Sequence, residues 1–350
     1  MTLRARNEAD ILDAQLSFHL NAGVDFVVAI DNGSRDGTSE ILESYARDGY
    51  VDVTHDATEY DEGGWVTKMA RRAATEFGAD WVINSDADEF WWPRGGSLKD
   101  VLAAVPARYG SVRGMWRHFS PRPQSDDFFA ERMTVRVCNP GAEDNSPYSP
   151  RYKTAHRADP DVEVLPGNHR ALGRALEPIR GWYPIDVLHF PIRSLRHFTE
   201  KYLRQWALLQ TRFGEAVDQA HRSGRLRELY EAYLVDDFVL AEGIADGTLA
   251  VDTRLRDALR SLRAKEPHGP RAFALPPRAE RLAFADAAVD EGYLSEVATL
   301  EDGDPHAHAQ RKAEDIETRL AAIEQRHSMR IVNLVSARVR LGNRSDPRDP

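Results

Sequence analysis

Two patterns of hydrophobic and polar residues alternate along the first hundred residues. Short apolar runs at residues 26–30 and 81–84 have the length and composition of strands that are buried on both faces. Between such runs, as at residues 11–20 and 68–77, apolar residues recur every three or four positions, which is the spacing of a helix. Repeated strand–helix units predict an α/β fold, with a mostly parallel sheet and helices on both faces.

Turn and capping residues mark the ends of the predicted elements. Gly23 predicts the C-terminal end of the first helix, and Thr38 predicts the N-terminal cap of the next. Beyond residue 95 the pattern is mixed. Further predicted elements are strands at 3–6, 51–53, 111–119, 131–138 and 186–190, helices at 97–105 and between 195 and 262, and loops at 32–37, 126–131 and 141–150.

Carboxylates follow two of the predicted strands directly. Asp31 and Asp86 each stand at the carboxyl end of a strand, so both fall on the edge of the sheet where open α/β folds bind ligands. Asp86 and Asp88 are two residues apart and project to the same side. Two like charges held so close repel, and a divalent cation would remove the conflict. The sequence therefore predicts a ligand site at this edge.

Composition narrows the class of protein. A net charge of −10 over 350 residues argues against a general nucleic-acid binder, which needs a basic surface. The single cysteine, Cys138, excludes an internal disulfide and a cysteine-based zinc cluster, and it fits a reducing cytoplasm. Neither a signal peptide nor an apolar run of about 20 residues is visible, so we expect a cytoplasmic protein.

Three motifs together resemble one enzyme family. They are Arg-Asn-Glu-Ala-Asp at residues 6–10, Asp-Asn-Gly-Ser-Arg-Asp-Gly-Thr at 31–38 and Asp-Ala-Asp-Glu-Phe at 86–90. Their order and strand placement resemble family 2-type glycosyltransferases with a GT-A fold, in the branch with Asn-Glu-Ala-Asp and Asp-Ala-Asp-Glu-Phe motifs. The resemblance covers roughly the first half of the chain. It implies a Rossmann-like, mostly parallel sheet with a mixed acceptor half, followed by C-terminal helices.

The resemblance also implies a nucleotide-sugar donor, such as a UDP-, GDP- or dTDP-sugar. Arg6 and Asn7 would line the nucleotide pocket, and Asp31, with Asn32 beside it, would bind the base or ribose. On the helix between the motifs, Lys68 or Arg71 could meet the diphosphate; the alternative is that both lie on a solvated helix face.

A divalent cation, Mn²⁺ or Mg²⁺, is implied by the third motif. Asp86 would lie near the ribose and the metal's water shell, and Asp88 would ligate the metal that bridges the diphosphate. His189 resembles a late histidine that completes such a metal shell, so the implied metal residues are Asp86, Asp88 and His189. The alternative for His189 is a core histidine on a strand.

The implied reaction is a single displacement with inversion, in which a general base takes a proton from the acceptor hydroxyl. The candidate bases in the second half are Asp186, His169 and Glu163. Trp91 or Trp92 could stack on a sugar, although core packing is the more common fate of tryptophan. Acceptors in view are a carbohydrate, a glycolipid or a small molecule. Alternative functions are a silent carbohydrate-binding scaffold on the same fold and a sugar-phosphate nucleotidyltransferase.

We expect three regions along the chain. Residues 1–193 form the glycosyltransferase domain, with a nucleotide-sugar half at 1–95 and an acceptor half at 96–193. A helical extension at 194–265 and a linker with a helical tail at 266–350 follow. Because the tail carries arginines among apolar residues, it could contact an anionic membrane surface peripherally. The alternatives are packing on its own domain and pairing with a second copy.

Overall fold

The computed structural model describes residues 1–58, 62–123, 128–138, 151–201, 203, 223–265 and 297. The chain divides into two compact units, Met1–Val297 and Ala298–Pro350, and the second lies outside the described residues. The linker and tail expected at 266–350 therefore remain predictions, as do the membrane and oligomer contacts of that tail. Among the described residues, no helix is both long enough and apolar enough to cross a bilayer.

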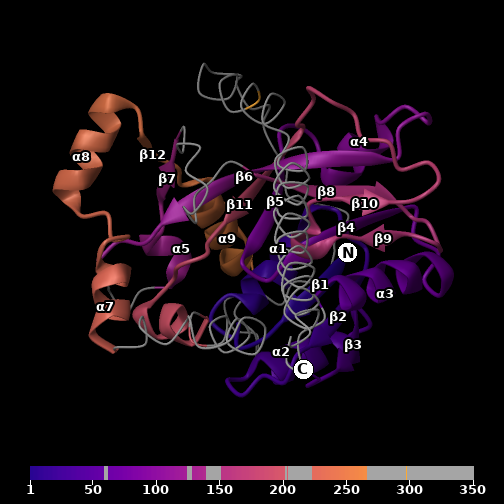
Figure 1. Ribbon diagram of the computed structural model, residues 1–350, viewed down its shortest axis with the longest axis horizontal. Coiled ribbons are helices and arrows are strands. Elements are labelled where there is room, and N and C mark those ends of the chain that lie inside the picture. The colour runs from indigo at the N-terminus through magenta and orange to yellow at the C-terminus, as the bar shows by residue number, and fades with distance from the viewer. Residues whose placement is uncertain are drawn as a thin grey trace, which may run out of the picture. The chain divides into compact units, whose positions relative to one another are not determined.

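Ten strands of the described chain form one sheet (Figure 1). Along its main path the order is β12-β7-β6-β8-β4-β1-β2-β3, and β11 joins β5 to β6. The strands are β1 (Thr2–Ala5), β2 (Val27–Asp31), β3 (Val51–His55), β4 (Trp81–Asp86), β5 (Glu89–Pro93), β6 (Ser111–Ser120), β7 (Val135–Val137), β8 (Tyr152–Arg157), β11 (Ile185–His189) and β12 (Leu249–Val251). Two short strands, β9 (Glu163–Val164) and β10 (Ala171–Leu172), pair separately.

The direction of the strands changes halfway along the sheet. Strands β4, β1, β2 and β3 are mutually parallel. Beyond them β8 runs antiparallel to β4 and to β6, and β11 runs parallel to β6 but antiparallel to β5. The α/β architecture with a mostly parallel first half and a mixed second half is thus confirmed.

Helices cover both faces of the parallel half. The described helices are α1 (Leu12–Ala22), α2 (Thr38–Arg47), α3 (Glu62–Thr75), α4 (Leu98–Ala103), α5 (Phe129–Arg132), α7 (Ser223–Glu231), α8 (Asp237–Asp246) and α9 (Arg254–Lys265), together with the short 3₁₀ segment η1 (Pro166–Asn168). Because side chains alternate along β2, Val27 and Ala29 pack in the core that contains α1, whereas Val28 and Ile30 pack in the core that contains α3.

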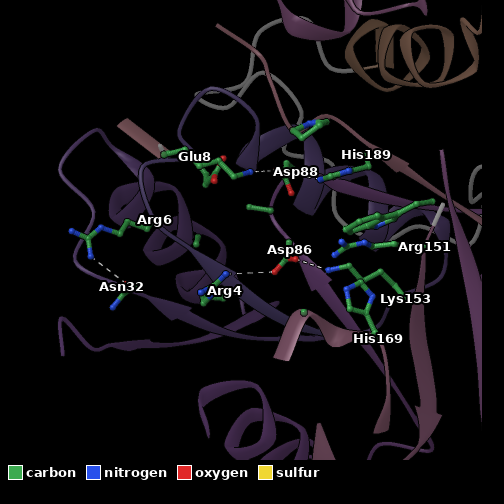
Figure 2. A pocket seen from close by; sticks show the side chains of 16 residues that line it. Arg4, Arg6, Glu8, Asn32, Asp86, Asp88, Arg151, Lys153, His169 and His189 are labelled. Carbon is green, nitrogen blue, oxygen red and sulfur yellow. Dashed lines mark hydrogen bonds and ion pairs between the residues drawn. The ribbon is translucent and has the colours of Figure 1, made fainter. Parts of the chain in front are cut away.

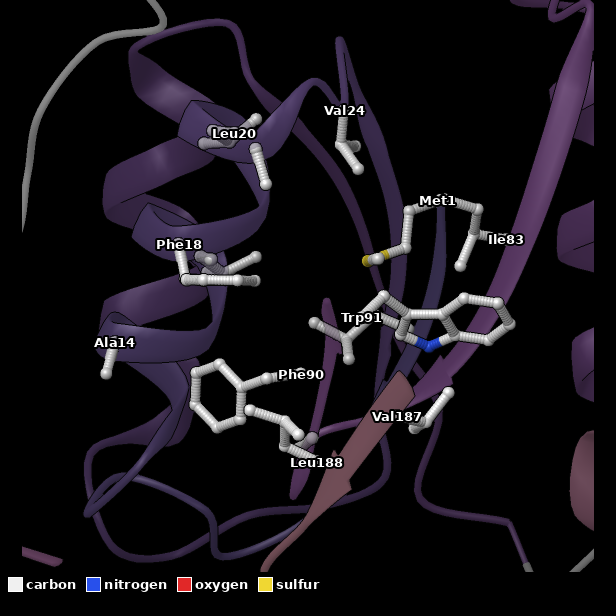
Figure 3. Packing of buried hydrophobic residues seen from close by; sticks show 14 of the residues in the cluster. Met1, Ala14, Phe18, Leu20, Val24, Ile83, Phe90, Trp91, Val187 and Leu188 are labelled. Atoms are coloured by element: carbon white, nitrogen blue, oxygen red, sulfur yellow. The ribbon is translucent and has the colours of Figure 1, made fainter. Parts of the chain in front are cut away.

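The core on the α1 face also explains the tryptophan that follows the acidic motif. Figure 3 shows Phe18 and Leu20 of α1 facing Phe90 and Trp91 of β5. Trp91 is fully buried, so it packs in the core and does not face solvent or a sugar. Strand β5 was not predicted, because its apolar residues follow directly on a run of three carboxylates.

Of the two capping predictions, the one at Gly23 is confirmed and the one at Thr38 is wrong. Gly23 ends α1 with a φ of 119°, and Ser97 caps α4 with a reciprocal hydrogen bond to Asp100. Thr38, however, is the first residue of α2, and Gly37, with a φ of 100°, is its N-cap. The Thr38 hydroxyl accepts a hydrogen bond from the Glu8 backbone instead, at 2.8 Å.

The strand predicted at 131–138 is also partly wrong. Phe129–Arg132 form one helical turn, α5, and only Val135–Val137 are extended. Phe129 and Met133 are both buried, so the local pattern follows helical spacing. In the region expected as a helical extension, β12 pairs with β7 of the main sheet. The boundary at residue 193 stays a prediction.

A buried ion cluster ties β11 to its neighbours. The Asp186 carboxylate is 2% exposed, and its Oδ1 lies 3.1 Å from Arg94 Nη1 and 3.1 Å from Arg117 Nε. Its Oδ2 lies 2.7 Å from Nη1 of Arg254, the first residue of α9. Burial alone would raise the pKa of Asp186, but the three guanidiniums hold it well below its usual value.

We expect Asp186→Asn to destabilise the fold strongly, because it leaves three guanidiniums facing a neutral amide. Breaking a buried pair from one side costs about 3–5 kcal/mol, so the free energy of unfolding in urea should fall by about 3 kcal/mol. The lowered pKa means that this stabilisation is present above about pH 4 and is lost as the pH falls further. The variant should therefore lose less stability than the wild type on acidification.

Asp25→Asn is the matched control, because Asp25 forms an exposed pair with Lys99 at 2.6 Å. Exposed pairs contribute about 0–1 kcal/mol, so this change should be nearly silent. Equal urea midpoints for the two variants would contradict the role of the buried cluster.

Candidate active site

A cavity of about 380 Å³ opens at the carboxyl ends of β1 and β4 (Figure 2). The segment that follows β11 and the start of β8 complete its wall. Its polar lining is formed by Arg4, Arg6, Glu8, Asn32, Asp86, Asp88, Arg151, Lys153, His169, His189 and Lys201, with Trp116 beside them.

The register of the parallel strands explains why these residues meet. Arg4 of β1 stands opposite Asp86 of β4, and Ala5 stands opposite Asp31 of β2. The three motifs therefore leave the sheet at the same edge, as the sequence predicts. Asp86 ends β4, and Asp88 follows in the turn before β5.

Two of the carboxylates share one buried ammonium group. Lys153 Nζ lies 2.6 Å from Asp86 Oδ2 and 2.9 Å from Glu89 Oε1, and the lysine side chain is 1% exposed. Burial would raise the pKa of Asp86, but Lys153 and Arg4 hold it below its usual value. Burial raises the pKa of Glu89 to about 8, with Lys153 opposing the shift. One cation thus contacts two acidic side chains, and both oxygens of Glu89 accept hydrogen bonds, Oε1 from Trp116 and Oε2 from the Asp86 backbone.

Asp88 is paired with a different lysine. Its Oδ2 lies 2.8 Å from Lys201 Nζ and 3.7 Å from His189 Nε2. Burial would raise the pKa of Asp88, but the Lys201 ammonium outweighs it and holds this carboxyl well below its usual range. Burial lowers the pKa of His189 well below its usual value, so its imidazole is neutral. The His189 ring stacks on Trp116 with 4.4 Å between centroids.

The first motif is held in place by a buried guanidinium. Arg193 is fully buried beyond the end of β11, and it donates to both oxygens of Asp10 at 2.7 and 2.9 Å. It also donates to Glu8. These contacts therefore tie the loop that carries Arg6 and Asn7 to the segment that follows β11.

The first and second motifs also bind each other. Asn7 has a φ of 54°, and its side-chain oxygen accepts from the backbone of Arg35 at 2.9 Å. In return, the Asn7 backbone donates to Ser34 Oγ at 3.1 Å, and the Ala9 backbone donates to Asp36 at 3.1 Å. These contacts hold the loop after β1 against the loop after β2. They explain why the polar residues of the two motifs occur at these positions along each loop.

The predicted nucleotide-binding residues take different positions. Arg6 and Asn32 line the cavity and are joined by a hydrogen bond of 3.3 Å. Asn7 lines an adjoining cavity of about 100 Å³, which Arg6 also lines. Asp31 is 3% exposed and accepts from the Ser34 backbone at 3.0 Å. It lies at the same sheet edge without lining the larger cavity.

The two basic residues predicted on α3 do not line the cavity either. Lys68 is exposed, and Arg71 donates to the carbonyl oxygen of Val162 at 2.8 Å. Their contact with a diphosphate stays a prediction.

Of the three candidate bases, His169 lines the cavity. Its Nδ1 lies 2.6 Å from the carbonyl oxygen of Tyr152, and burial, together with Lys153, lowers the pKa of His169 to about 3. Glu163 is exposed on β9, and Asp186 is enclosed by the arginine cluster. The structure thus brings together Asp86, Asp88, His169 and His189, but it places Glu163 and Asp186 elsewhere.

Sequence reasoning missed the lysines that balance the acidic motif. Lys153 lies on β8, which was not predicted, although a lone lysine between Tyr152 and Thr154–Ala155 in a strand-like run is a usable signal. Lys201 was seen only as part of a helical pattern, and residues 195–201 are indeed helical.

The predicted metal residues can be compared with the coordination chemistry of divalent cations. In the described part of the chain, no cluster of three or more histidine, cysteine, aspartate or glutamate side chains is arranged to hold an ion. Asp88 and His189 nevertheless approach to 3.7 Å, and the imidazole is neutral. One carboxylate and one imidazole suit Mn²⁺ or Mg²⁺ when substrate phosphates supply the remaining ligands.

Comparison with known proteins identifies the N-terminal part of the chain. Residues 5–133 match the model of glycosyl transferase family 2. No curated protein matches the chain.

Several solved structures are similar. TarS from S. aureus, as residues 1–349 with UDP-GlcNAc, is 15% identical, with 65% of this chain and 70% of that chain covered and a TM-score of 0.35. The mannosyltransferase PcManGT from Pyrobaculum calidifontis, with GDP-Man and Mn²⁺, is 17% identical, with 87% and 86% covered and a TM-score of 0.30.

The assignment of this chain to a protein family depends on the family match, not on these structural similarities. That match contains all three motifs, and the sheet has the architecture that the resemblance implies. Residues 5–133 of this chain therefore form a glycosyl transferase family 2 domain.

Proposed function

We propose that this protein transfers a sugar from a nucleoside-diphosphate sugar to an acceptor hydroxyl, with a divalent cation and with inversion at the anomeric carbon. The cavity at the carboxyl ends of β1 and β4 carries this proposal. Five arginine or lysine side chains and three carboxylates line it, so its lining has an excess of two positive charges. Such a lining suits the diphosphate of a donor.

The arginines of the cavity would stabilise the leaving group of this reaction. Negative charge develops on the nucleoside diphosphate as it leaves the sugar, and fixed cations aimed at that charge lower the barrier. Arg4 and Arg6 lie on the strand and loop that enter the cavity, and Arg151 lies on the opposite wall. Asn32 lines the cavity just beyond the end of β2, with Asp31 beside it, and these two residues are the ones we propose for the nucleoside.

Asp88 and His189 are the residues that would hold the cation. When bound, Mn²⁺ or Mg²⁺ supplies Lewis-acid stabilisation of the departing diphosphate. Asp86 is committed to Lys153 at 2.6 Å, so its contribution is to fix the buried charge beside the donor. The presence of Mn²⁺ in PcManGT is consistent with this choice of cation.

His169 is the base that the geometry favours among the three candidates. Its Nδ1 donates to the Tyr152 carbonyl, so Nε2 carries the lone pair that can take the acceptor proton. The residue also helps to line a second cavity of about 190 Å³, on the side of Ser111 and Arg113, as well as the large one. A base shared by two cavities can act between a donor and an acceptor in a single displacement.

Asp88→Ala should abolish metal-dependent donor binding while the fold remains intact. We expect the release of nucleoside diphosphate from UDP-GlcNAc or GDP-mannose with Mn²⁺, water serving as acceptor, to fall by about 100-fold or more. Circular dichroism and a melting curve check the fold. Unchanged turnover in this variant would refute the assignment of Asp88 to the metal.

His169→Gln should lower kcat by up to about 100-fold, the low end for general-base catalysis because a ring with a pKa of about 3 is a weak base, with little change in the KM for the donor. Glu163→Gln is the control and should behave like the wild type. Because the pKa of His169 is lowered to about 3, its ring stays neutral above about pH 4, and its protonation should not reduce the rate between pH 5 and 8. A His169→Gln variant with full kcat would move the base elsewhere.

A further inference from the structure

Lys201 occupies a position that a metal ion should require. Its ammonium lies 2.8 Å from Asp88 Oδ2, the same oxygen that His189 Nε2 approaches to 3.7 Å. A cation shared by Asp88 and His189 needs this oxygen. An ammonium and a divalent cation repel each other at such a distance, so both cannot be held there together.

The two lysines of the site differ in how firmly they are held. Lys153 is 1% exposed, contacts two carboxylates and lies 4.9 Å from the centre of the Trp116 ring. The Lys201 side chain is 39% exposed, and in the described part of the chain its ion pair is the one with Asp88. Lys153 is thus a fixed part of the core, whereas Lys201 can leave Asp88 by rotating its flexible stem into water or towards a ligand.

A diphosphate bound in the cavity would offer the Lys201 ammonium a new partner. Lys201 lines both the 380 Å³ cavity and the adjoining cavity of about 100 Å³, together with Arg6 and Glu8. An anion in the larger cavity would lie within reach of an ammonium that has been expelled from Asp88.

We propose that Lys201 is a displaceable internal cation. It neutralises Asp88 in the empty site, yields Asp88 to the divalent cation, and then pairs with the diphosphate of the donor. This inference rests on the proposed function and adds that the cation and the nucleotide bind cooperatively. The cation alone binds weakly because it must expel Lys201, whereas cation and nucleotide bind cooperatively because the diphosphate receives the expelled ammonium. Such coupling is reciprocal.

Lys201→Gln tests the proposal through metal binding in the absence of turnover. Titration of Mn²⁺, followed by the EPR signal of the free ion, should show about tenfold tighter binding of Mn²⁺ alone than in the wild type. Adding UDP or GDP should strengthen Mn²⁺ binding in the wild type but much less in the variant. At saturating Mn²⁺, the affinity of the variant for the nucleotide should be lower than that of the wild type.

Two further variants sharpen the test. Lys201→Arg keeps the charge and should keep the weak binding of Mn²⁺ alone. Arg196→Gln removes an exposed cation of the same helical stretch, one that pairs with Glu200 at 3.0 Å, and should leave Mn²⁺ binding unchanged.

The outcomes separate this inference from the proposed function. If the wild type binds Mn²⁺ and nucleotide and releases nucleoside diphosphate, but Lys201→Gln binds Mn²⁺ alone with equal or lower affinity, the inference is overturned and the function stands. If the wild type binds no Mn²⁺ with or without UDP or GDP, both are overturned. Tighter Mn²⁺ binding with a smaller nucleotide effect supports the inference.

Discussion

Three carboxylates within four residues, at a largely buried sheet end, are the constraint on which the rest of this site depends. Asp86, Asp88 and Glu89 are each 24% exposed or less, and such a group of charges cannot persist without compensation. The fold brings Lys153 from β8 and Lys201 from the segment after β11, and burial raises the pKa of Glu89 to about 8. The acidic motif is therefore a balanced unit whose counter-charges belong to distant parts of the chain.

The same balance connects the site to the sheet. Arg193, four residues beyond the end of β11, holds Glu8 and Asp10 beside the acidic motif, so the first loop cannot move independently of that motif. Asp186, on β11 itself, shows the opposite arrangement, because one carboxylate is enclosed by three guanidiniums. Strand β11 and the segment after it thus contribute to two buried ion clusters. The three motifs lie in the first half of the chain, but the charges that hold them in place come in part from the second half.

The sequence predicted the parallel half of the fold and the edge at which the site lies, because both follow from local pattern. Apolar runs define the strands, and the carboxylates that follow them fall on one edge whatever the loops do. His189, which was singled out by its resemblance to a late histidine, lines the cavity, and its role at a metal stays a prediction. The candidate bases could not be distinguished in this way, since Glu163, His169 and Asp186 differ in burial and partners, not in local pattern.

The contacts that could not be predicted are those between residues far apart in the sequence. Lys153 and Lys201 lie 67 and 113 residues from the carboxylates that they neutralise, and nothing near them in the sequence records that pairing. Thr38 shows the same effect on a smaller scale. Its sequence context favours a helix cap, but its hydroxyl accepts a hydrogen bond from the backbone of Glu8, thirty residues away.

The central claim is that this cavity holds a nucleoside diphosphate together with a divalent cation. The most direct test is thermal unfolding of the full chain with UDP-, GDP- and dTDP-sugars, each with and without Mn²⁺. A ligand that binds only the folded state raises the melting temperature. We predict a rise that requires both Mn²⁺ and one of the three nucleotides. A melting temperature that no combination changes, or a rise that is the same without Mn²⁺, would contradict the claim.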